Sequence, residues 1–249
     1  MSGPASMKLA SPTPVDAKIR KRYLLLYLLI IFISFIPLTI FEYYYYQWFW
    51  VSSLFWLFWL LLPLNILIAI YLLLFCSIII SRIILSIVNL IHKPKEGIFK
   101  RDIADKDYKY WNIRNLIKKW PMFVAFTNPF PWLKNRFVLR CFGVKIGKHS
   151  ACDQAWISSE FVSIGKNVIC GISSAILSYG IEQDKFYIQK IIVGDNVLMG
   201  SKVVLMPGTK IGENTNVFAH TYTLSGQILE ANSNYRGHPA KSFEDSELK

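Results

Sequence analysis

The stretch Ile191–Gly212, IIVGDNVLMGSKVVLMPGTKIG, decides the fold, because aliphatic residues recur in it every six positions. One series is Val193, Met199, Leu205 and Ile211, and a glycine directly follows three of its four members. A six-residue period punctuated by glycine is typical of a solenoid in which each unit supplies one short strand and one turn. The stretch therefore predicts stacked coils rather than a single compact sheet.

The same period extends in both directions along the chain. The downstream members are Val217, Thr223 and Leu229, and the upstream series is Ile146, Cys152, Ser158, Ile164, Cys170 and Ile176. Six of the 13 glycines occupy the slot after these residues, at positions 147, 165, 171, 194, 200 and 212. Three units make an 18-residue triangular coil, and stacked coils bury their inward residues in one core. We therefore predict an all-β parallel β-helix over residues 141–241, with a C-terminal tail over residues 242–249.

The two series are out of phase, since Ile176 and Val193 are 17 residues apart rather than 18. The segment Ser178–Lys190, SYGIEQDKFYIQK, is therefore expected to leave the regular stack. Loops that depart from a solenoid commonly carry its function.

The N-terminal half is strongly apolar. Tyr23–Phe41 is an uncharged run of 19 residues, close to the roughly 20 that cross a bilayer as a helix. A second apolar stretch runs from Trp48 to about Ile91, and Tyr43–Trp48 resembles an interfacial aromatic belt. We predict a transmembrane helical hairpin over residues 23–92 whose second helix continues beyond the bilayer. A cleaved signal peptide is the alternative, but the run is too long for one and no small-residue cleavage site follows it.

The net charge of +12 is unevenly distributed. Residues 1–41 carry a net charge of +4 and residues 82–140 carry +9, whereas residues 141–249 are neutral. Basic clusters that flank apolar helices indicate the cytoplasmic side, so both termini and the β-helix domain are expected there. The distribution suits an anionic lipid surface, and the sequence shows no nucleic-acid-binding motif, so we expect no nucleic-acid partner.

The segments that flank the hairpin are a basic N-terminus, residues 1–22, and a basic juxtamembrane linker, residues 93–140. Within the linker, residues 112–120, NIRNLIKKW, place apolar side chains on one helical face and Arg114, Lys118 and Lys119 on the other. This pattern predicts an amphipathic helix in the membrane interface. The alternative is a surface helix packed on the following domain. The prolines between Pro121 and Trp132 predict that this stretch is not one regular helix.

Residues 144–241 resemble the left-handed β-helix acyltransferases of the hexapeptide-repeat superfamily. The stretch Ile191–Gly212 and the ending Tyr235–Lys241, YRGHPAK, resemble the galactoside and maltose O-acetyltransferase branch. The likeness covers about 100 residues. The membrane arrangement is more loosely similar to the C-terminal region of poly-lysine synthetases.

The resemblance implies a homotrimer that takes acetyl-CoA or acyl-CoA as co-substrate in a groove between adjacent solenoids. By position, Gly200, Ser201 and Lys202 would line the pantetheine groove, with Ala219 one coil later. Lys241 would approach the phosphates of CoA as a point charge. The alternative for both lysines is an ordinary solvated surface.

The chain departs from the family at the general base. Such enzymes use a histidine in the loop that corresponds to Ser178–Lys190, and this loop has none. It offers Glu182 and Asp184 instead, and a carboxylate can act as base if burial raises its pKa. The alternative is that both carboxylates only solvate the loop or hold a trimer contact. His149, in the first coil with Asp153 and Trp156, is the third candidate.

The remaining histidines and the cysteines indicate no metal site. The closest histidine pair, His220 and His238, is 18 residues apart, whereas the zinc chemistry known on this fold needs a closer pair and a third ligand. Cys152 and Cys170 occupy inward slots one coil apart, as small hydrophobic residues do. This usage indicates a reducing compartment.

The sequence as a whole predicts an integral membrane acyltransferase. It would move an acetyl or acyl group from CoA to a hydroxyl or amine of a membrane-associated acceptor. One alternative is an amide-bond-forming transferase similar to poly-lysine synthetases. The other is a catalytically inactive trimeric scaffold, which the missing loop histidine favours.

Overall fold

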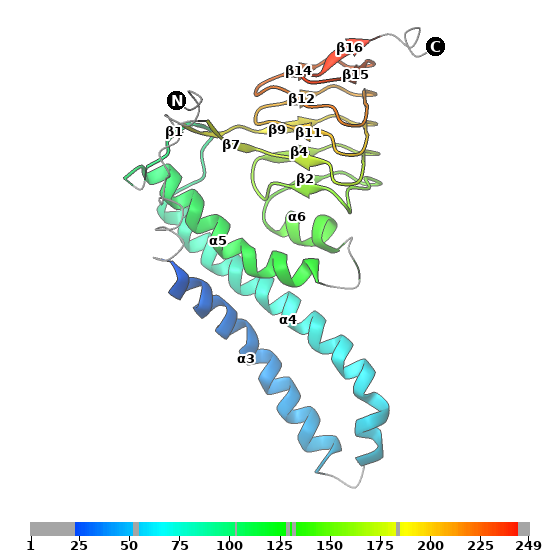
Figure 1. Cartoon of the computed structure of the whole chain (residues 1–249). Coiled ribbons are helices and arrows are strands. Elements are labelled where there is room, and N and C mark those ends of the chain that lie inside the picture. The colour runs from blue at the N-terminus through cyan, green and yellow to red at the C-terminus, as the bar shows by residue number, and fades with distance from the viewer. Residues whose placement is uncertain are drawn as a thin grey trace, which may run out of the picture.

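The structure is a computed structural model that describes residues 23–51, 55–102, 104–127, 130, 133–182 and 185–243. A helical arm and a β-solenoid meet at one junction, with the solenoid stacked on the end of the arm (Figure 1). The C-terminal strands lie at the end of the solenoid farthest from the arm (Figure 1).

The arm is an antiparallel pair of long helices, α3 (Leu24–Phe49) and α4 (Phe55–Ile91). Both are long and apolar enough to cross a membrane, a test that core helices of soluble proteins and leader sequences also pass. The 37 residues of α4 extend about 55 Å at 1.5 Å per residue, well beyond a hydrocarbon core of about 30 Å. The predicted pair of long apolar helices with a longer second member is confirmed, although Tyr43–Trp48 belongs to the end of α3 rather than following it.

Polar contacts tie the two long helices together at the end far from the solenoid. The Asn65 side-chain amide donates to the Glu42 carboxylate, with Nδ2–O distances of 3.0 and 3.2 Å. The Tyr45 hydroxyl donates to the Phe58 carbonyl at 2.7 Å. Because both partners of each contact lie on apolar helices, these bonds fix the register of the pair.

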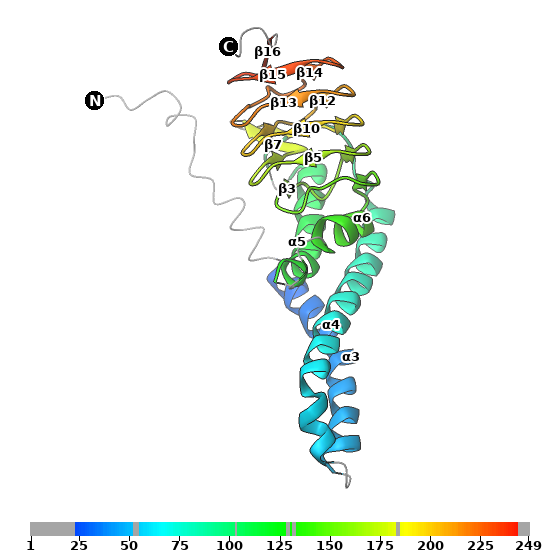
Figure 2. The same ribbon diagram turned by 90° about the vertical axis from the view of Figure 1, so that its right-hand side faces the viewer.

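The third long helix, α5 (Lys106–Phe126), lies along α4 on the solenoid side (Figures 1 and 2). Asp105 caps it, since its carboxylate accepts from the Tyr108 N–H at 3.1 Å. The predicted helix therefore exists and is longer than expected, since it continues through Pro121. It ends at Phe126, within the stretch from Pro121 to Trp132 that was predicted not to be one regular helix. Pro121 is buried, and the next turn is held by Val124 and Ala125 in the apolar cluster shared with α3 and α4. Packing on both sides of the proline offsets its missing hydrogen bond.

The chain between α4 and the solenoid also contains β1 (Gly97–Lys100), a π-helical turn η1 (Lys134–Val138) and α6 (Leu139–Cys141). The turn η1 and α6 cover the first coil of the solenoid at the junction (Figure 1). Val138 and Leu139 are fully buried there.

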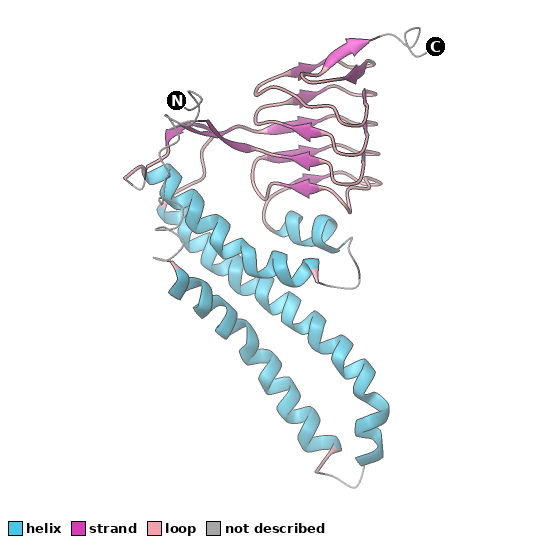
Figure 3. Cartoon of the chain, in the orientation of Figure 1, coloured by secondary structure: helices cyan, strands magenta, loops and turns pink. Residues whose placement is uncertain are grey.

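The solenoid is a three-sided parallel β-helix, as its repeat predicts (Figure 3). One side holds β2 (Lys145–Ile146), β4 (Val162–Ile164), β9 (Ile191–Val193), β12 (Lys210–Ile211) and β14 (Ile228–Leu229). The second holds β5 (Ile169–Cys170), β10 (Leu198–Met199), β13 (Asn216–Val217), β15 (Asn234–Arg236) and the antiparallel β16 (Lys241–Phe243). The third holds β3 (Trp156–Ile157), β6 (Ala175–Ile176) and β11 (Val204–Leu205).

The six-residue series marks the core. All of its members, from Ile146 to Leu229, are buried. A second set of buried residues stands two positions before members of the series: Val144, Val162, Val168, Ile191, Val197 and Val203. Trp156, which has the same spacing, is 62% exposed, because Ala155 fills the core in the first coil.

The segment that breaks the phase is ordered as a β-hairpin. Residues that pair between neighbouring coils are normally 18 positions apart in the sequence, as Leu198 and Asn216 are. Across this segment the separation is 29 positions, as between Ile169 and Leu198. The extra residues form β7 (Tyr179–Glu182) and β8 (Lys185–Ile188), and β1 adds to β8 as a third antiparallel strand. The predicted departure from the stack is confirmed, and its form is a small sheet.

The corners of the solenoid explain the recurring asparagines and glycines. Asn167, Asn196, Asn214 and Asn232 all have φ near +55° and are joined by side-chain hydrogen bonds of 3.0–3.1 Å from coil to coil. Asparagine tolerates this left-handed conformation better than most residues. At Gly165 a Cβ would lie 2.3 Å from Asp195 Oδ1 and 2.5 Å from the Gly194 carbonyl oxygen, so only glycine fits between these coils.

We predict that Gly165→Ala lowers the free energy of unfolding by about 2 kcal/mol, because the added methyl forces neighbouring coils apart. Gly180→Ala is the matched control, since its Cβ would meet Pro207 Cγ at an ordinary 3.4 Å. The control is expected to change stability by less than about 0.5 kcal/mol. Denaturant titration followed by circular dichroism measures both, and equal effects would contradict the close-stacking explanation.

Candidate functional site

Four of the predicted cofactor-binding residues meet at one corner of the solenoid, where β10 and β13 end. The Gly200 N–H donates to the Val217 carbonyl at 2.7 Å, and the His220 N–H donates to the Ser201 carbonyl at 2.9 Å. A Cβ on Gly200 would lie 2.4 Å from Ala219 N, so the two coils are in close contact. We call Gly200, Ser201, Lys202 and Ala219 the glycine corner.

The glycine corner presents hydrogen-bond donors and a positive charge. Ser201, Lys202 and Ala219 are exposed, and Lys202 occupies the turn with φ +57°. Within the described part of the chain, the N–H groups of Ser201 and Ala219 form no hydrogen bond. Two backbone donors one coil apart, beside an ammonium group, are suited to an extended ligand with amide carbonyls and anionic ends.

Lys241, the fifth predicted cofactor residue, lies in β16 at the C-terminal end of the solenoid. It stands opposite Arg236 in the β15–β16 pair, on the same side of the solenoid as β10 and β13. Lys241 is exposed, and the neighbouring Arg236 guanidinium packs over the Phe243 ring at 4.5 Å. The structure therefore places Lys241 on the same side of the solenoid as the glycine corner, but not in that corner.

Glu182 is exposed at the tip of the β7–β8 hairpin, where it pairs in register with Lys185. Asp184 lies outside the described residues. Glu182 is exposed in the single chain, so it lacks the enclosed environment that a carboxylate needs to act as a general base.

The base of the same hairpin is packed against α5 by aromatic side chains. Phe186 is fully buried, with ring-centroid distances of 4.5 Å to Trp111 and 5.0 Å to Tyr108. Tyr179 adds a contact at 4.7 Å to Trp111. On the other side of the hairpin, the Lys190 N–H donates to the Glu96 carboxylate at 2.8 Å. The segment in which function was expected is thus held firmly against the helical arm.

His149 lies in the first coil, at the same corner of the solenoid as the row of hydrogen-bonded asparagines that begins at Asn167. Its φ is +60° and its side chain is exposed. In the described part of the chain, no hydrogen bond, ion pair or ring contact joins His149 to Asp153 or Trp156. Trp156 packs instead on Phe126 at 6.3 Å, and the Lys134 ammonium lies over both rings. Burial lowers the pKa of Lys134, and the charge of Asp153 opposes that shift. The structure does not bring the predicted first-coil residues together.

The polar face of α5 packs on the solenoid. Arg114 Nε and Lys118 Nζ both contact Glu160 Oε1, at 3.0 and 2.5 Å, and both basic side chains are buried. The prediction that these residues lie in the lipid interface is wrong, and the alternative of packing on the following domain is correct. The physical reason is that α3 and α4 cover the apolar face of α5, which leaves its polar face to the solenoid.

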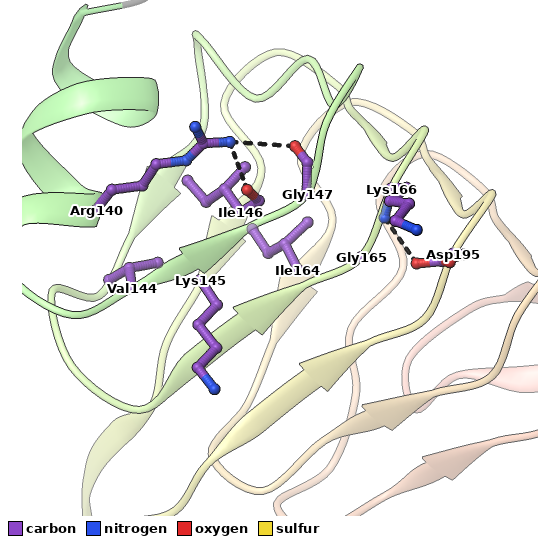
Figure 4. Close-up of a pocket in the computed structure, with 9 residues that line it drawn as sticks. All are labelled: Arg140, Val144, Lys145, Ile146, Gly147, Ile164, Gly165, Lys166 and Asp195. Atoms are coloured by element: carbon purple, nitrogen blue, oxygen red, sulfur yellow. Dashed lines mark hydrogen bonds between the residues drawn. The ribbon is translucent and has the colours of Figure 1, made fainter.

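Two cavities adjoin the first coils, and neither was predicted. The first, of about 450 Å³, is open and includes Arg140, Lys145, Lys166 and Asp195 (Figure 4). Its Arg140 guanidinium donates to the carbonyls of Ile146 and Gly147, and Asp195 accepts from the Lys166 N–H at 2.7 Å. Two of its charged groups therefore bond to the solenoid backbone. The second cavity, of about 540 Å³, lies between α5, the first coils and the β7–β8 hairpin, and Lys118 lines it.

The histidines and cysteines show no metal-binding arrangement. Among the described residues, no three His, Cys, Asp or Glu side chains lie close enough to share a metal ion. His238 packs beside Tyr222 at 6.1 Å. Cys152 and Cys170 are buried inward residues with free thiols 2.6 Å apart, and the contact with Cys152, together with burial, raises the pKa of Cys170.

Comparison with known proteins supports the predicted resemblance to acetyltransferases. No protein-family model matches the chain. The Bacillus subtilis (strain 168) protein named "Putative acetyltransferase YvoF" is 29% identical over 102 residues, which cover 39% of this chain and 59% of the relative. The chain therefore spans about three-fifths of the length of that relative. The resemblance to acetyltransferases is confirmed at this level.

Several solved structures are similar in fold to part of the chain. Galactoside acetyltransferase in complex with coenzyme A has a TM-score of 0.43 and 19% identity, covering 52% of this chain and 78% of its own. A hexapeptide-repeat acetyltransferase of Vibrio cholerae, complexed with acetyl coenzyme A, has a TM-score of 0.44 and 16% identity, covering 57% and 91%. A maltose O-acetyltransferase from Clostridium difficile 630 has a TM-score of 0.36 and 19% identity, covering 48% and 79%. Similarity at this level supports no statement about activity.

We predict that Phe186→Ala frees the β7–β8 hairpin from α5, because it removes the fully buried ring between Trp111 and Tyr108. The local cost is about 3–4 kcal/mol, and amide hydrogen exchange in β7 and β8 should rise accordingly. Tyr187→Ala, on the opposite face of β8, is the control and should leave exchange nearly unchanged. Unchanged exchange in Phe186→Ala would show that the aromatic cluster does not hold the hairpin.

Proposed function

We propose that the protein is an acyltransferase that takes acetyl-CoA or acyl-CoA at the glycine corner. The observation that carries the proposal is the pair of available N–H donors of Ser201 and Ala219 beside Lys202. Such donors suit the amide carbonyls of a pantetheine arm, and Lys202 and Lys241 supply positive charge for the phosphates. The similarity to an acetyltransferase over 102 residues supports the same class of reaction.

We further propose that α3 and α4 anchor the enzyme in a membrane, with both termini and the solenoid on the cytoplasmic side. The apolar side chains of both helices are largely exposed, which a bilayer would cover. The flanking positive charge supports this orientation. Tethering would raise the local concentration of a membrane-associated acceptor, whose hydroxyl or amine receives the acyl group.

The proposed assembly is a homotrimer. Ile169, Ile172, Leu198 and Phe218 form an exposed apolar patch on β5, β10 and the turns that follow β5 and β13. This patch adjoins the glycine corner. A second copy packed on it would remove apolar surface from water and enclose a ligand at the corner.

Glu182, Asp184 and His149 remain the proposed bases. Glu182 and His149 need a neighbouring subunit to complete their environment, since both are exposed in the single chain. The poly-lysine-synthetase-like alternative would use the same arm but a donor other than CoA. The scaffold alternative has one specific observation in its favour, which is that the hairpin is packed on α5 and has no histidine.

The first experiment measures CoA binding by calorimetry with the full-length protein in lipid nanodiscs. Lys202→Glu is expected to weaken binding at least tenfold, because a charge-assisted contact to a phosphate is replaced by repulsion. Lys210→Glu, on a different side of the solenoid, is the matched control and should bind normally. Absence of CoA binding in the wild type would overturn the proposal. Release of CoA on adding membrane extract and acetyl-CoA would establish turnover.

The second experiment tests the assembly. We predict that Leu198→Glu converts trimers to monomers in mass photometry, because it buries an unpaired charge in the apolar patch. Ile228→Glu is the control, since Ile228 is also exposed but lies on another side of the solenoid, and this variant should remain trimeric. A monomeric wild type, or a trimeric Leu198→Glu, would contradict the proposed interface.

A further inference from the structure

The second cavity lies where the helical arm meets the solenoid. Its wall includes Trp111 of α5, Trp156 of β3, and Tyr179 and Ile181 of β7. Its volume of about 540 Å³ falls in the range of small-molecule sites, roughly 300–1,000 Å³. Aromatic and aliphatic walls of this kind favour an apolar occupant.

One end of the cavity carries an excess of buried positive charge. Lys118, which is 2% exposed, lines it, and Arg114, which is 1% exposed, lies beside Lys118 on the same carboxylate oxygen of Glu160. Two cations thus share a single anion. Lys119 also lines the cavity, and no Asp or Glu is among the described lining residues.

The hydrogen bonding of this cluster is incomplete in the single chain. Arg114 Nη1 and Glu160 Oε2 are both buried, and neither has a hydrogen-bond partner among the described residues. Among the same residues, Lys118 donates to Glu160 Oε1 at 2.5 Å and, over longer distances of 3.4 Å, to the Ser159 hydroxyl and carbonyl. Burial lowers the pKa of Lys118, while Glu160 opposes that shift. Buried charge without full compensation is costly, and an anion bound in the cavity beside Lys118 would add a second negative charge to the two cations.

The apolar walls of the cavity are complementary to an apolar chain, and its basic residues are complementary to an anionic group. Together they suit an amphiphilic ligand. Arginine and lysine together are suited to phosphate, through directed donors and a point charge. The cavity also adjoins the β7–β8 hairpin, which carries Glu182.

We infer that this cavity binds the phosphate headgroup of a single-chain amphiphile, and that this amphiphile is the acyl acceptor. The inference rests on the proposed acyltransferase function and adds the substrate class to it. The phosphate lies against Lys118, and the chain lies along Trp111, Tyr179 and Ile181. The acceptor then leaves the membrane surface and enters the cavity with its alkyl chain.

The test is photo-crosslinking of the full chain in nanodiscs with dodecyl phosphate that carries a diazirine on its alkyl chain. Mass spectrometry should locate the label on α5, β3 or β7. Unlabelled dodecyl phosphate should compete at least tenfold better than inorganic phosphate or dodecyl maltoside. Equal competition by inorganic phosphate would overturn the role of the apolar walls, and equal competition by the maltoside would overturn the role of the charge.

Two variants separate the contributions of charge and space. Lys118→Met should lower the crosslink yield about tenfold, since it removes the charged donor and leaves Arg114 paired with Glu160. Ile181 lines the cavity but is partly exposed on β7, so a tryptophan at this position can fill the cavity without disturbing the core. Ile181→Trp should therefore abolish labelling, and it tests the inference independently if Lys118→Met does not fold. Lys210→Met is the control and should label as the wild type does. Label outside the cavity, or full labelling of Ile181→Trp, would overturn the inference.

Calorimetry with CoA on the same samples separates the two proposals. CoA binding without labelling of the cavity would leave the acyltransferase proposal standing and overturn the acceptor site. Labelling of the cavity without CoA binding would overturn the acyltransferase proposal and, with it, the role of the amphiphile as acceptor.

Discussion

The contact of Glu160 with Arg114 and Lys118 determines how the solenoid is held on its helical arm. It joins the first coil to the polar face of α5, whose apolar face is already occupied by α3 and α4. Removing one partner from a buried ion cluster lowers the stability of the folded protein by several kcal/mol. The solenoid and the helical arm therefore have one strongly favoured arrangement. The position of the solenoid above the arm follows from that arrangement.

The same helix controls the segment that interrupts the repeat. Phe186 and Tyr179 bury their rings against α5, and β1 extends the hairpin into a three-stranded sheet. The hairpin therefore closes one side of the junction cavity and keeps Glu182 at its outer edge. The glycine corner lies at a different corner of the solenoid, so a site that uses both requires a neighbouring subunit. The homotrimer is for this reason part of the proposed chemistry rather than an addition to it.

The sequence predicts the solenoid well because its signal is local and repeated. Each six-residue unit carries its own inward residue, and the close packing of coils at Gly165 and Gly200 accounts for the glycine slot. The surroundings of α5 were not predictable in the same way. Its amphipathic pattern separates an apolar from a polar face, but it does not show that Glu160, more than 40 residues away, covers the polar one. The junction cavity depends on three separate segments, and no single motif marks it.

The most direct test of this account measures the rigidity of the junction. Spin labels at Leu90→Cys on α4 and Lys210→Cys on β12 occupy exposed positions on the two parts, once Cys76 and Cys141 have been replaced by serine. Double electron–electron resonance on the full chain in nanodiscs gives the distribution of distances between them. The account predicts one narrow distribution in the wild type and a broad one in Glu160→Ala. A broad distribution in the wild type would contradict it, because the solenoid would then move freely on its arm.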